Sequence, residues 1–376
     1  MNSATMNSAR WVLCSVVIGS AVAWSLAHPL HHSHGRSETS PPAKVAEVLT
    51  TAAGVSGQGG LRFRVLYTGA HLPEAALTVL ESAHGGFAVN RRPSRGETYF
   101  ALPGAGIVEI SGDLKSTRLL DTDESMKGKN LHNTTIWFDP DGTPFLTFPA
   151  NNAGLVFTTT LQGKLVHTLG IPGERDRFDQ PAVDDYFFVR GSFAPTDVEH
   201  LEGLFYITTG YSSLDYVLTA KIISTDPFRA VWNDLAFGGK GDGPGEFGTG
   251  HGITVSPDKK RVDVADRSQS EIDRFTRYGH YRSTWKMPIG SFPCDIDYSG
   301  DLAVAGCLHG PDRSKGAPIY LLDNGKVVST VMIKEELGLE KFQHIHNAVL
   351  RKIGDRYYII VQAWNPGDFA ILEQLG

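Results

Sequence analysis

From Gly59 to the C-terminus, hydrophobic and polar residues alternate over short runs, and clusters of Gly, Asp, Pro and Asn separate the runs. Such alternation is typical of short strands joined by tight turns. One stretch shows the pattern most clearly, because a glycine-rich lead-in there precedes four apolar runs. These runs read "HGITV", "RVDVADR", "SEIDRF" and "YRSTWKM", beginning at His251. Four antiparallel strands in succession predict one blade of a β-propeller.

The same unit recurs along the chain. Candidate blades begin at His84, His132, Thr196, His251, Cys294 and His346. Successive starts are separated by 43 to 64 residues, which is about the length that four strands and their turns need. We therefore expect an all-β fold of six blades.

The last unit reaches the C-terminus after only three strands. An unmatched apolar run, "LRFRVLY" at Leu61–Tyr67, lies at the other end of the repeats. We expect this N-terminal strand to complete the last blade and close the ring, which removes an exposed sheet edge. The sequence thus predicts a six-bladed β-propeller domain over residues 59–376.

Composition changes this picture little. Hydrophobic residues make up 41% of the chain, charged residues make up 20%, and the net charge is −6. These values are typical of a globular protein. No basic patch or stripe of basic and aromatic residues stands out, so we expect no nucleic-acid partner. We expect a monomer that takes a small-molecule or peptide substrate.

The N-terminus has the layout of a secretory signal peptide over residues 1–27. Arg10 precedes an apolar run from Trp11 to Ala23, and the small residues Ser25 and Ala27 precede a cleavage point before His28. The alternative is an uncleaved anchor. We expect a secreted or periplasmic protein with no membrane association after cleavage.

Residues 28–58 are rich in His, Pro and Ser, which predicts a flexible linker. Four histidines, His28, His31, His32 and His34, are either a metal-collecting cluster or a solvated tail.

Two cysteines remain after the signal, Cys294 and Cys307, on either side of a turn at Ser299-Gly300. Facing positions on adjacent strands would allow a disulfide in an oxidising compartment. The alternative is a pair of buried thiols.

The stretch from Gly241 resembles an NHL repeat. The residues that carry the likeness are Gly241, Gly243-Pro244-Gly245, Phe247, His251-Gly252-Ile253, Val264-Ala265-Asp266-Arg267 and Ile272. Within that group, the placement of histidines resembles peptidyl-α-hydroxyglycine α-amidating lyase, a six-bladed zinc enzyme of the secretory pathway. The resemblance covers residues 60–376 at the level of architecture. Asn347 departs from it, because an acidic residue follows the third metal ligand in the lyase.

Three alternate blades begin with the same signature: "LHNTTIWF" at His132, "GHGITV" at His251 and "IHNAVL" at His346. First strands line the central channel, so these imidazoles should converge with approximate three-fold symmetry. Catalytic zinc takes three protein ligands and keeps one position open. We therefore predict a zinc site at these three histidines. His84 adds a fourth channel histidine, and His344 is a weaker candidate than His346.

The resemblance implies two further functional residues. It implies a tyrosine base on the blade between the first two ligands, and "TTGYSSLDYV" offers Tyr211. It also implies an arginine on the first blade that holds the substrate carboxylate, and "FAVNRRPS" offers Arg91, with Arg92 as its neighbour. A structural calcium ion in the channel is implied by the resemblance alone. We interpret the "VADR" motif as structural, and "GKGDGPGEFG" is no phosphate loop because no helix follows it.

The expected function is a metal-dependent lyase that cleaves the C–N bond of a carbinolamide or α-hydroxyglycine at a zinc site. The alternative is a non-catalytic NHL-repeat propeller that binds a peptide or protein. A third interpretation, a calcium-dependent lactonase or esterase of the same architecture, would need acidic ligands in the channel. A fold shared by many functions does not decide among them.

Overall fold

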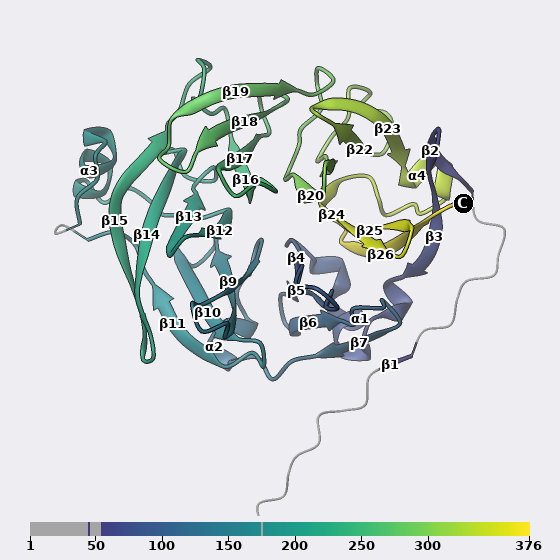
Figure 1. Cartoon of the computed structure of the whole chain (residues 1–376), viewed down its shortest axis with the longest axis horizontal. Coiled ribbons are helices and arrows are strands. Elements are labelled where there is room, and N and C mark those ends of the chain that lie inside the picture. Colours follow the sequence, from purple (N-terminus) through teal and green to yellow (C-terminus); the bar gives the residue numbers. More distant parts are fainter. Residues whose placement is uncertain (1–43, 46–53, 174–175) are drawn as a thin grey trace, which may run out of the picture. The chain divides into compact units, whose positions relative to one another are not determined.

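Six antiparallel sheets follow one another along the chain in the computed structural model, which describes residues 44–45, 54–173 and 176–376. Figure 1 shows the six sheets arranged around a common centre. The first strands of neighbouring sheets contact one another, as β12 does with β8 and β16. The predicted six-bladed β-propeller is therefore confirmed. The expected signal peptide and the four histidines that follow it lie outside the described residues.

The first three blades are built as follows. Blade 1 contains β4 (Ala88–Val89), β5 (Thr98–Leu102), β6 (Gly106–Ile110) and β7 (Ser116–Leu119), with β1 (Lys44–Val45) at its outer edge. Blade 2 contains β8 (Thr135–Phe138), β9 (Pro144–Ala150), β10 (Leu155–Thr160) and β11 (Leu165–Leu169). Blade 3 contains β12 (Asp197–Leu201), β13 (Leu204–Thr208), β14 (Tyr216–Thr225) and β15 (Phe228–Gly238).

The other three blades complete the ring. Blade 4 contains β16 (Gly250–Val255), β17 (Arg261–Asp266), β18 (Glu271–Thr276) and β19 (Tyr281–Lys286). Blade 5 contains β20 (Asp297–Ser299), β21 (Leu302–Gly306), β22 (Pro318–Asp323) and β23 (Lys326–Met332). Blade 6 contains β24 (Ile345–Ile353), β25 (Arg356–Ala363), β26 (Asp368–Gln374), β3 (Leu61–Thr68) and β2 (Ser56–Gln58).

Blade 6 joins the two ends of the propeller. Strand β3 pairs with the last strand, β26, and their register runs from Thr68 opposite Ala370 to Phe63 opposite Gln374. The predicted closing strand is therefore confirmed, and β2 adds a fifth strand outside it. Both β1 and β2 fall within the segment that we expected to be a linker, where they pair with β7 and β3.

Helices are short and lie in the connections. They are η1 (Gly69–His71), α1 (Glu74–Val79), η2 (Leu80–Ser82), α2 (Glu124–Lys127), α3 (Pro181–Phe188) and α4 (Ile333–Leu337). Among the described residues, none of the helices has the length and hydropathy to cross a membrane.

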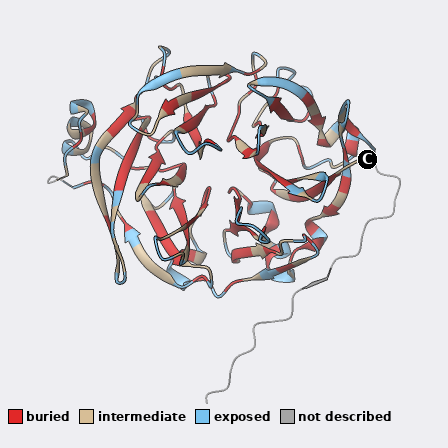
Figure 2. Cartoon of the chain, viewed as in Figure 1, coloured by how far each residue is buried: buried red, intermediate tan, exposed pale blue. Residues whose placement is uncertain are grey.

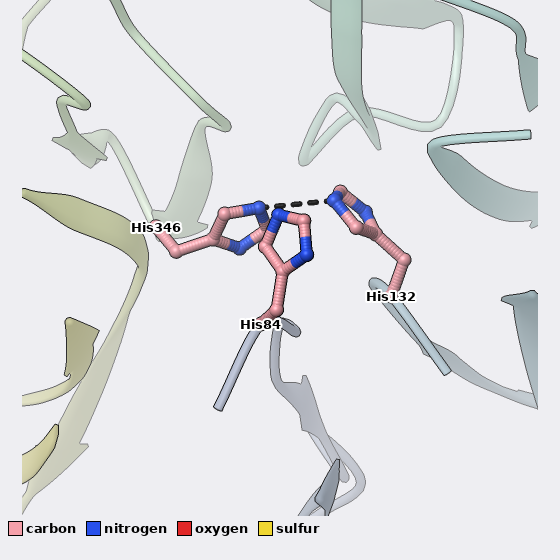
Figure 3. A group of neighbouring side chains, drawn as sticks. All are labelled: His84, His132 and His346. Atoms are coloured by element: carbon pink, nitrogen blue, oxygen red, sulfur yellow. Dashed lines mark hydrogen bonds between the residues drawn. The ribbon is translucent and has the colours of Figure 1, made fainter. Parts of the chain in front are cut away.

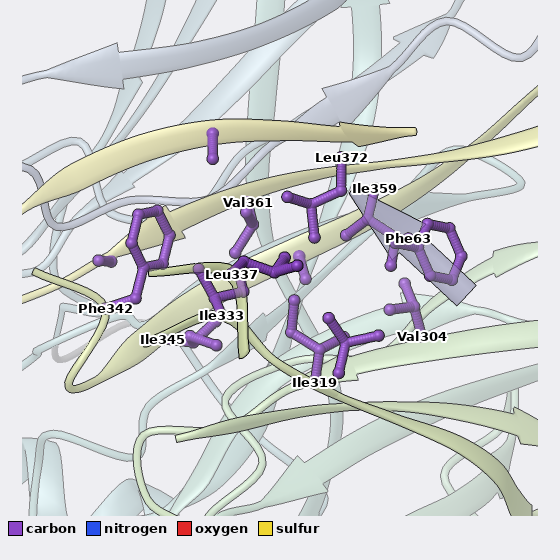
Figure 4. Close-up of a cluster of buried hydrophobic side chains, with 14 of the residues drawn as sticks. Phe63, Val304, Ile319, Ile333, Leu337, Phe342, Ile345, Ile359, Val361 and Leu372 are labelled. Atoms are coloured by element: carbon purple, nitrogen blue, oxygen red, sulfur yellow. The ribbon is translucent and has the colours of Figure 1, made fainter. Parts of the chain in front are cut away.

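The hydrophobic core is divided among the blade interfaces. Buried residues run along the strands of every blade, as Figure 2 shows. The cluster between blades 5 and 6 contains Phe63 from β3, Ile319 from β22 and Val361 from β25 (Figure 4). Comparable clusters join each other pair of neighbouring blades. Because apolar side chains fill the spaces between sheets, the first strands are left to line the channel with polar groups.

The expected disulfide between Cys294 and Cys307 is not formed. Both cysteines are free and fully buried. The register explains why, since Pro293, not Cys294, lies opposite Cys307. Successive residues of an extended strand point to opposite faces, so Cys294 points away from the face that Cys307 occupies.

Ring closure generates the first prediction. Replacing Phe63 with Ala removes a fully buried ring from the closing strand, and we expect a loss of about 3–5 kcal/mol in the free energy of unfolding. Replacing the exposed neighbour Arg62 with Ala is the matched control and should change it by less than about 0.5 kcal/mol. Denaturant unfolding of both variants measures the difference. Equal stability of the two variants would contradict the closure.

Candidate metal centre

Three histidines from alternate blades meet on the axis of the ring. His132 precedes β8, and His251 and His346 are the second residues of β16 and β24. Their ring centroids are 4.5 Å apart for His132–His346, 4.9 Å for His132–His251 and 5.1 Å for His251–His346. All three are at most 1% exposed. The structure thus brings together the three predicted residues, which we call the histidine site.

Each of these imidazoles is held by a carbonyl of the next blade. The Nδ1 atoms of His132, His251 and His346 lie 2.5 Å, 2.6 Å and 2.8 Å from the carbonyl oxygens of Thr196, Cys294 and Gly85. A carbonyl oxygen only accepts hydrogen bonds, so each Nδ1 carries the proton. Each Nε2 is therefore left with a bare lone pair, which is the form that binds a metal.

The Nε2 atoms of His132 and His346 are 3.0 Å apart. Two bare lone pairs at this distance repel each other unless a proton or a cation lies between them. Two nitrogens on one tetrahedral zinc ion are on the order of 3.3 Å apart, given Zn–N bonds of about 2.0–2.1 Å. Burial also lowers the pKa of all three histidines well below the ordinary value, which keeps the imidazoles neutral. His132 and His346 therefore fit two ligand positions of a zinc ion, whereas the histidines whose ligand atoms all lie within 4.8 Å of one another include His84 and not His251.

His84 is a fourth histidine at this site, half-buried in front of blade 1. Its ring centroid lies 4.6 Å from that of His132 and 4.5 Å from that of His346 (Figure 3). These three residues could also hold a metal, since their ligand nitrogens lie within 4.8 Å of one another. However, the side-chain amide of Asn130 donates to Nδ1 of His84 at 2.9 Å. In the neutral ring that bond places the proton on Nε2, which makes His84 a poorer ligand than His251.

Tyr211 lies beside the histidine site, as predicted. Its hydroxyl is 3.0 Å from Nε2 of His251, and since that nitrogen has a bare lone pair, the hydroxyl donates to it. Tyr211 is 37% exposed, so part of its side chain is open to solvent. Burial raises the pKa of Tyr211, while the Arg267 guanidinium acts in the opposite direction.

Arg267 was missed by sequence analysis. It is 8% exposed, and its guanidinium donates to the Tyr211 oxygen at 3.2 Å and to the Cys294 sulfur at 3.3 Å. No described carboxylate forms a salt bridge with it. Strand β17 runs antiparallel to β16 and pairs Asp266 with Gly250, so the residue after Asp266 reaches the histidine site. The "VADR" motif is structural only at Asp266, which accepts hydrogen bonds from neighbouring backbone amides.

Arg91 does not join this group. It follows β4 and lies seven residues beyond His84, which is roughly 20 Å along an extended strand. There its guanidinium binds both carboxylate oxygens of Asp297 at 2.6 Å. Arg92 lies nearby, stacked over the ring of Phe138. Alternation along β4 shows which face of the sheet a side chain occupies, but it does not show how far along the chain that side chain lies from the histidine site. Arg91 is separated from the site by this distance.

The other end of the channel opens into a cavity of about 1070 Å³. Six basic residues line it, namely Arg91, Arg92, Arg95, Lys259, Arg351 and Lys352. Five carboxylates from blades 3 and 5 also line it, namely Asp197, Glu199, Glu202, Asp295 and Asp297. Burial raises the pKa of Glu199 to about 7 and that of Asp295 to about 8. We call this set of carboxylates the acidic mouth. These carboxylates could not be recognised from the sequence, because single acids on separate blades form no local motif.

Buried amide side chains accompany two carboxylates of the acidic mouth. Asp197 and Asp295 are both buried, and the Asn347 amide donates to Asp295 at 2.8 Å. Asn133 is 1% exposed, and neither of its side-chain polar atoms has a hydrogen-bond partner. Carboxylate and amide oxygens suit calcium, so these residues fit the ion that the resemblance implies.

Comparisons with known proteins add no argument for the fold or the function. No protein-family model and no curated protein matches the chain. Among solved structures, virginiamycin B lyase from Staphylococcus aureus is 13% identical, with 78% of this chain and 96% of that chain covered and a TM-score of 0.44. A streptogramin B lyase is 11% identical, with 85% and 97% covered and a TM-score of 0.46.

A protein assigned as a gluconolactonase is also similar. It is 11% identical, with 88% of this chain and 98% of that chain covered and a TM-score of 0.48. Identities and TM-scores this low carry no information on substrate or reaction. The resemblance to the amidating lyase stays a prediction.

The two sets of three histidines generate a prediction. Replacing His251 with Ala should weaken zinc binding about 100-fold or more, because a bare Nε2 is lost. Replacing His84 with Ala should weaken it less than about tenfold, because that ring presents a proton. Competition titration with a chelator measures both affinities in the purified protein. If His84→Ala weakened zinc binding more than His251→Ala, the metal ligands would be His84, His132 and His346.

The acidic mouth generates a pH prediction. The pKa of Glu199 rises from 4.5 in the unfolded chain to about 7 in the folded chain. The contribution of Glu199 to the free energy of unfolding is therefore fully present below pH 4.5 and is lost as the pH rises through 7. In chelator, the Glu199→Gln variant should lose less unfolding free energy between pH 5 and pH 8 than the wild type, by up to about 3 kcal/mol. The exposed Glu340→Gln variant is the control. An unchanged pH dependence in Glu199→Gln would count against a raised pKa for this half-buried carboxyl.

Proposed function

We propose that this chain is an exported, metal-dependent lyase that cleaves the C–N bond of an α-hydroxyglycine amide at the histidine site. One observation carries the proposal: three neutral imidazoles from alternate blades, with ring centroids 4.5 to 5.1 Å apart, each have Nδ1 bound to a carbonyl, which leaves three Nε2 atoms unprotonated. The lone pairs of His132 and His346, with Nε2 atoms 3.0 Å apart, repel each other unless a proton or a cation lies between them. Export rests on the N-terminal sequence pattern.

His132, His251 and His346 would hold the metal, and zinc fits three nitrogen donors best. When bound, zinc supplies a Lewis acid for a substrate oxygen and a positive charge that lowers the pKa of neighbouring acids. The rest of the site consists of groups that the chain itself positions. Calcium, if bound in the channel, would be held by Asp197, Asp295 and Asn133 and would have a structural role.

Tyr211 is the base in this proposal. In its ionised form, with the hydroxyl proton already lost to solvent, the Tyr211 oxygen would take the proton of the substrate α-hydroxyl, and the electron pair left behind forms the carbonyl of glyoxylate. The C–N bond breaks, its electron pair goes to nitrogen, and the nitrogen takes the proton back from Tyr211. An amide and glyoxylate are the products. The pKa of Tyr211 has to fall for this step, and Arg267, 3.2 Å from its oxygen, acts in that direction.

Arg267 takes the role that we expected of Arg91. It is a buried cation without a carboxylate partner among the described residues, and its Nε atom has no hydrogen-bond partner. A guanidinium in this state favours an anionic ligand, since a carboxylate accepts hydrogen bonds from it and neutralises its charge. We therefore assign the substrate carboxylate to Arg267.

The proposal predicts the effect of removing the base. The zinc-loaded Tyr211→Phe variant should release glyoxylate from an N-acyl-α-hydroxyglycine at least about 100-fold more slowly than the wild type, because general base catalysis is lost. Its zinc content should equal that of the wild type, since Tyr211 is not a ligand. Tyr278→Phe, at a tyrosine that is 59% exposed, is the control and should keep full activity. A coupled assay for glyoxylate gives the rates.

Two results would contradict the proposal. Zinc-loaded wild type that releases no glyoxylate would leave a metal-binding propeller without this chemistry. Tyr211→Phe with unchanged activity would assign the base to another residue.

A further inference from the structure

Three buried carboxylates gather inside blade 4, away from the channel axis. The register pairs Asp266 of β17 with Glu271 of β18, and Val264 with Asp273. Asp266, Glu271 and Asp273 therefore share one face of the sheet, since alternate residues point the same way. They are 0%, 4% and 0% exposed, and their ligand oxygens lie within 4.8 Å of one another. We call them the blade-4 carboxylate cluster.

Asp266 is firmly held. Its carboxylate accepts hydrogen bonds from the backbone amides of Gly248 at 2.7 Å and Thr249 at 2.9 Å. Both amides belong to the end of the glycine-rich segment that leads into β16. This segment is therefore anchored to the cluster through Asp266. Its glycines are explained by this structural role and not by phosphate binding.

One of the two carboxylate oxygens of Asp273 has no hydrogen-bond partner. Its Oδ1 atom accepts a hydrogen bond from the Thr284 hydroxyl, while its buried Oδ2 atom has no hydrogen-bond partner. A buried, unpaired carboxylate oxygen is costly, and an ion is one explanation for such an atom. Burial, with Glu271 and Asp266 adding to it, raises the pKa of Asp273 to about 7.

The charges in the cluster do not balance. Among the described residues, the cation that pairs with these three carboxylates is Lys286, which lies opposite Glu271 on β19 and binds its Oε2 atom. The Lys286 side chain is 73% exposed and reaches the cluster from solvent. Arg274 lies near a different acid, Asp263, at 3.6 Å. With all three acids ionised, the cluster keeps two negative charges that a divalent cation would neutralise.

We propose that Asp266, Glu271 and Asp273 bind a hard divalent cation of the calcium type. Carboxylate oxygens are the ligands that such ions prefer, and no nitrogen or sulfur donor belongs to the cluster. The ion joins β17 to β18 and fixes the end of β17, where Arg267 begins its path to the histidine site. The site is distinct from the channel and does not depend on the proposed reaction.

Calcium itself is the probe. Wild-type protein stripped with a chelator, then dialysed, is titrated with CaCl₂ by calorimetry, and thermal unfolding is followed with and without 2 mM free calcium, a level on the order of the weaker calcium sites. The expected result is a calcium-dependent rise in Tm for the wild type. The Asp273→Asn variant should lose one equivalent of bound calcium, or bind that equivalent at least about tenfold more weakly, and should lose the rise in Tm.

Two controls separate the cluster from other effects. In chelator, the Asp273→Asn variant should unfold at or above the unfolding temperature of the wild type, because the substitution removes a buried charge that its neighbours repel. This result would also show that the variant folds. Glu81→Gln, at a surface pair with Lys341, should keep the calcium response. No calcium binding to the wild type, or full calcium binding by Asp273→Asn, would overturn the proposal, and the second result would assign calcium to the channel.

Discussion

The hydrogen bond from a histidine Nδ1 to a carbonyl of the following blade is the interaction on which the site depends. His132, His251 and His346 each make it, with Thr196, Cys294 and Gly85 as acceptors. The bond fixes both the direction of the ring and the tautomer. Because donors sit on even blades and acceptors on odd blades, the site exists only when all six blades are in register. Closure of blade 6 by β3 is what holds that register around the ring.

The channel has two chemically different ends. At one end lie the histidines, which begin the first strands, with Tyr211 and the buried Arg267 beside them. The cavity at the opposite mouth is lined by carboxylates and by basic side chains. Soft or borderline metals prefer the first end and hard cations prefer oxygen donors. A single fold thus separates a site suited to chemistry from regions suited to structural ions. The blade-4 carboxylate cluster extends the same separation away from the axis.

Repetition explains what could be predicted from the sequence. A strand, a turn and a histidine recurring on alternate units predicted the six blades, the closing strand at Leu61 and the convergence of three imidazoles. Position in the repeat placed each of these residues without any distance measurement. Tyr211 was placed beside the site by resemblance, and the hydrogen bond to His251 agrees with that placement.

What failed depended on register or on pairs of distant residues. Arg91 was chosen by resemblance, yet it lies at the end of β4 where only the length of the strand shows that it is too far away. Arg267 lies next to the site because β17 returns antiparallel to β16, a relation that becomes visible only with the pairing of Asp266 and Gly250. A shift of one residue likewise separates Cys294 from Cys307.

The central claim is that three Nε2 atoms share one metal ion. Crystals of the zinc-loaded protein, measured on both sides of the zinc absorption edge, test it most directly. The account predicts one anomalous peak on the ring axis, about 2.0–2.1 Å from Nε2 of His132, His251 and His346. A peak that replaces His251 with His84, a peak bound through Nδ1, or no peak on the axis would contradict it.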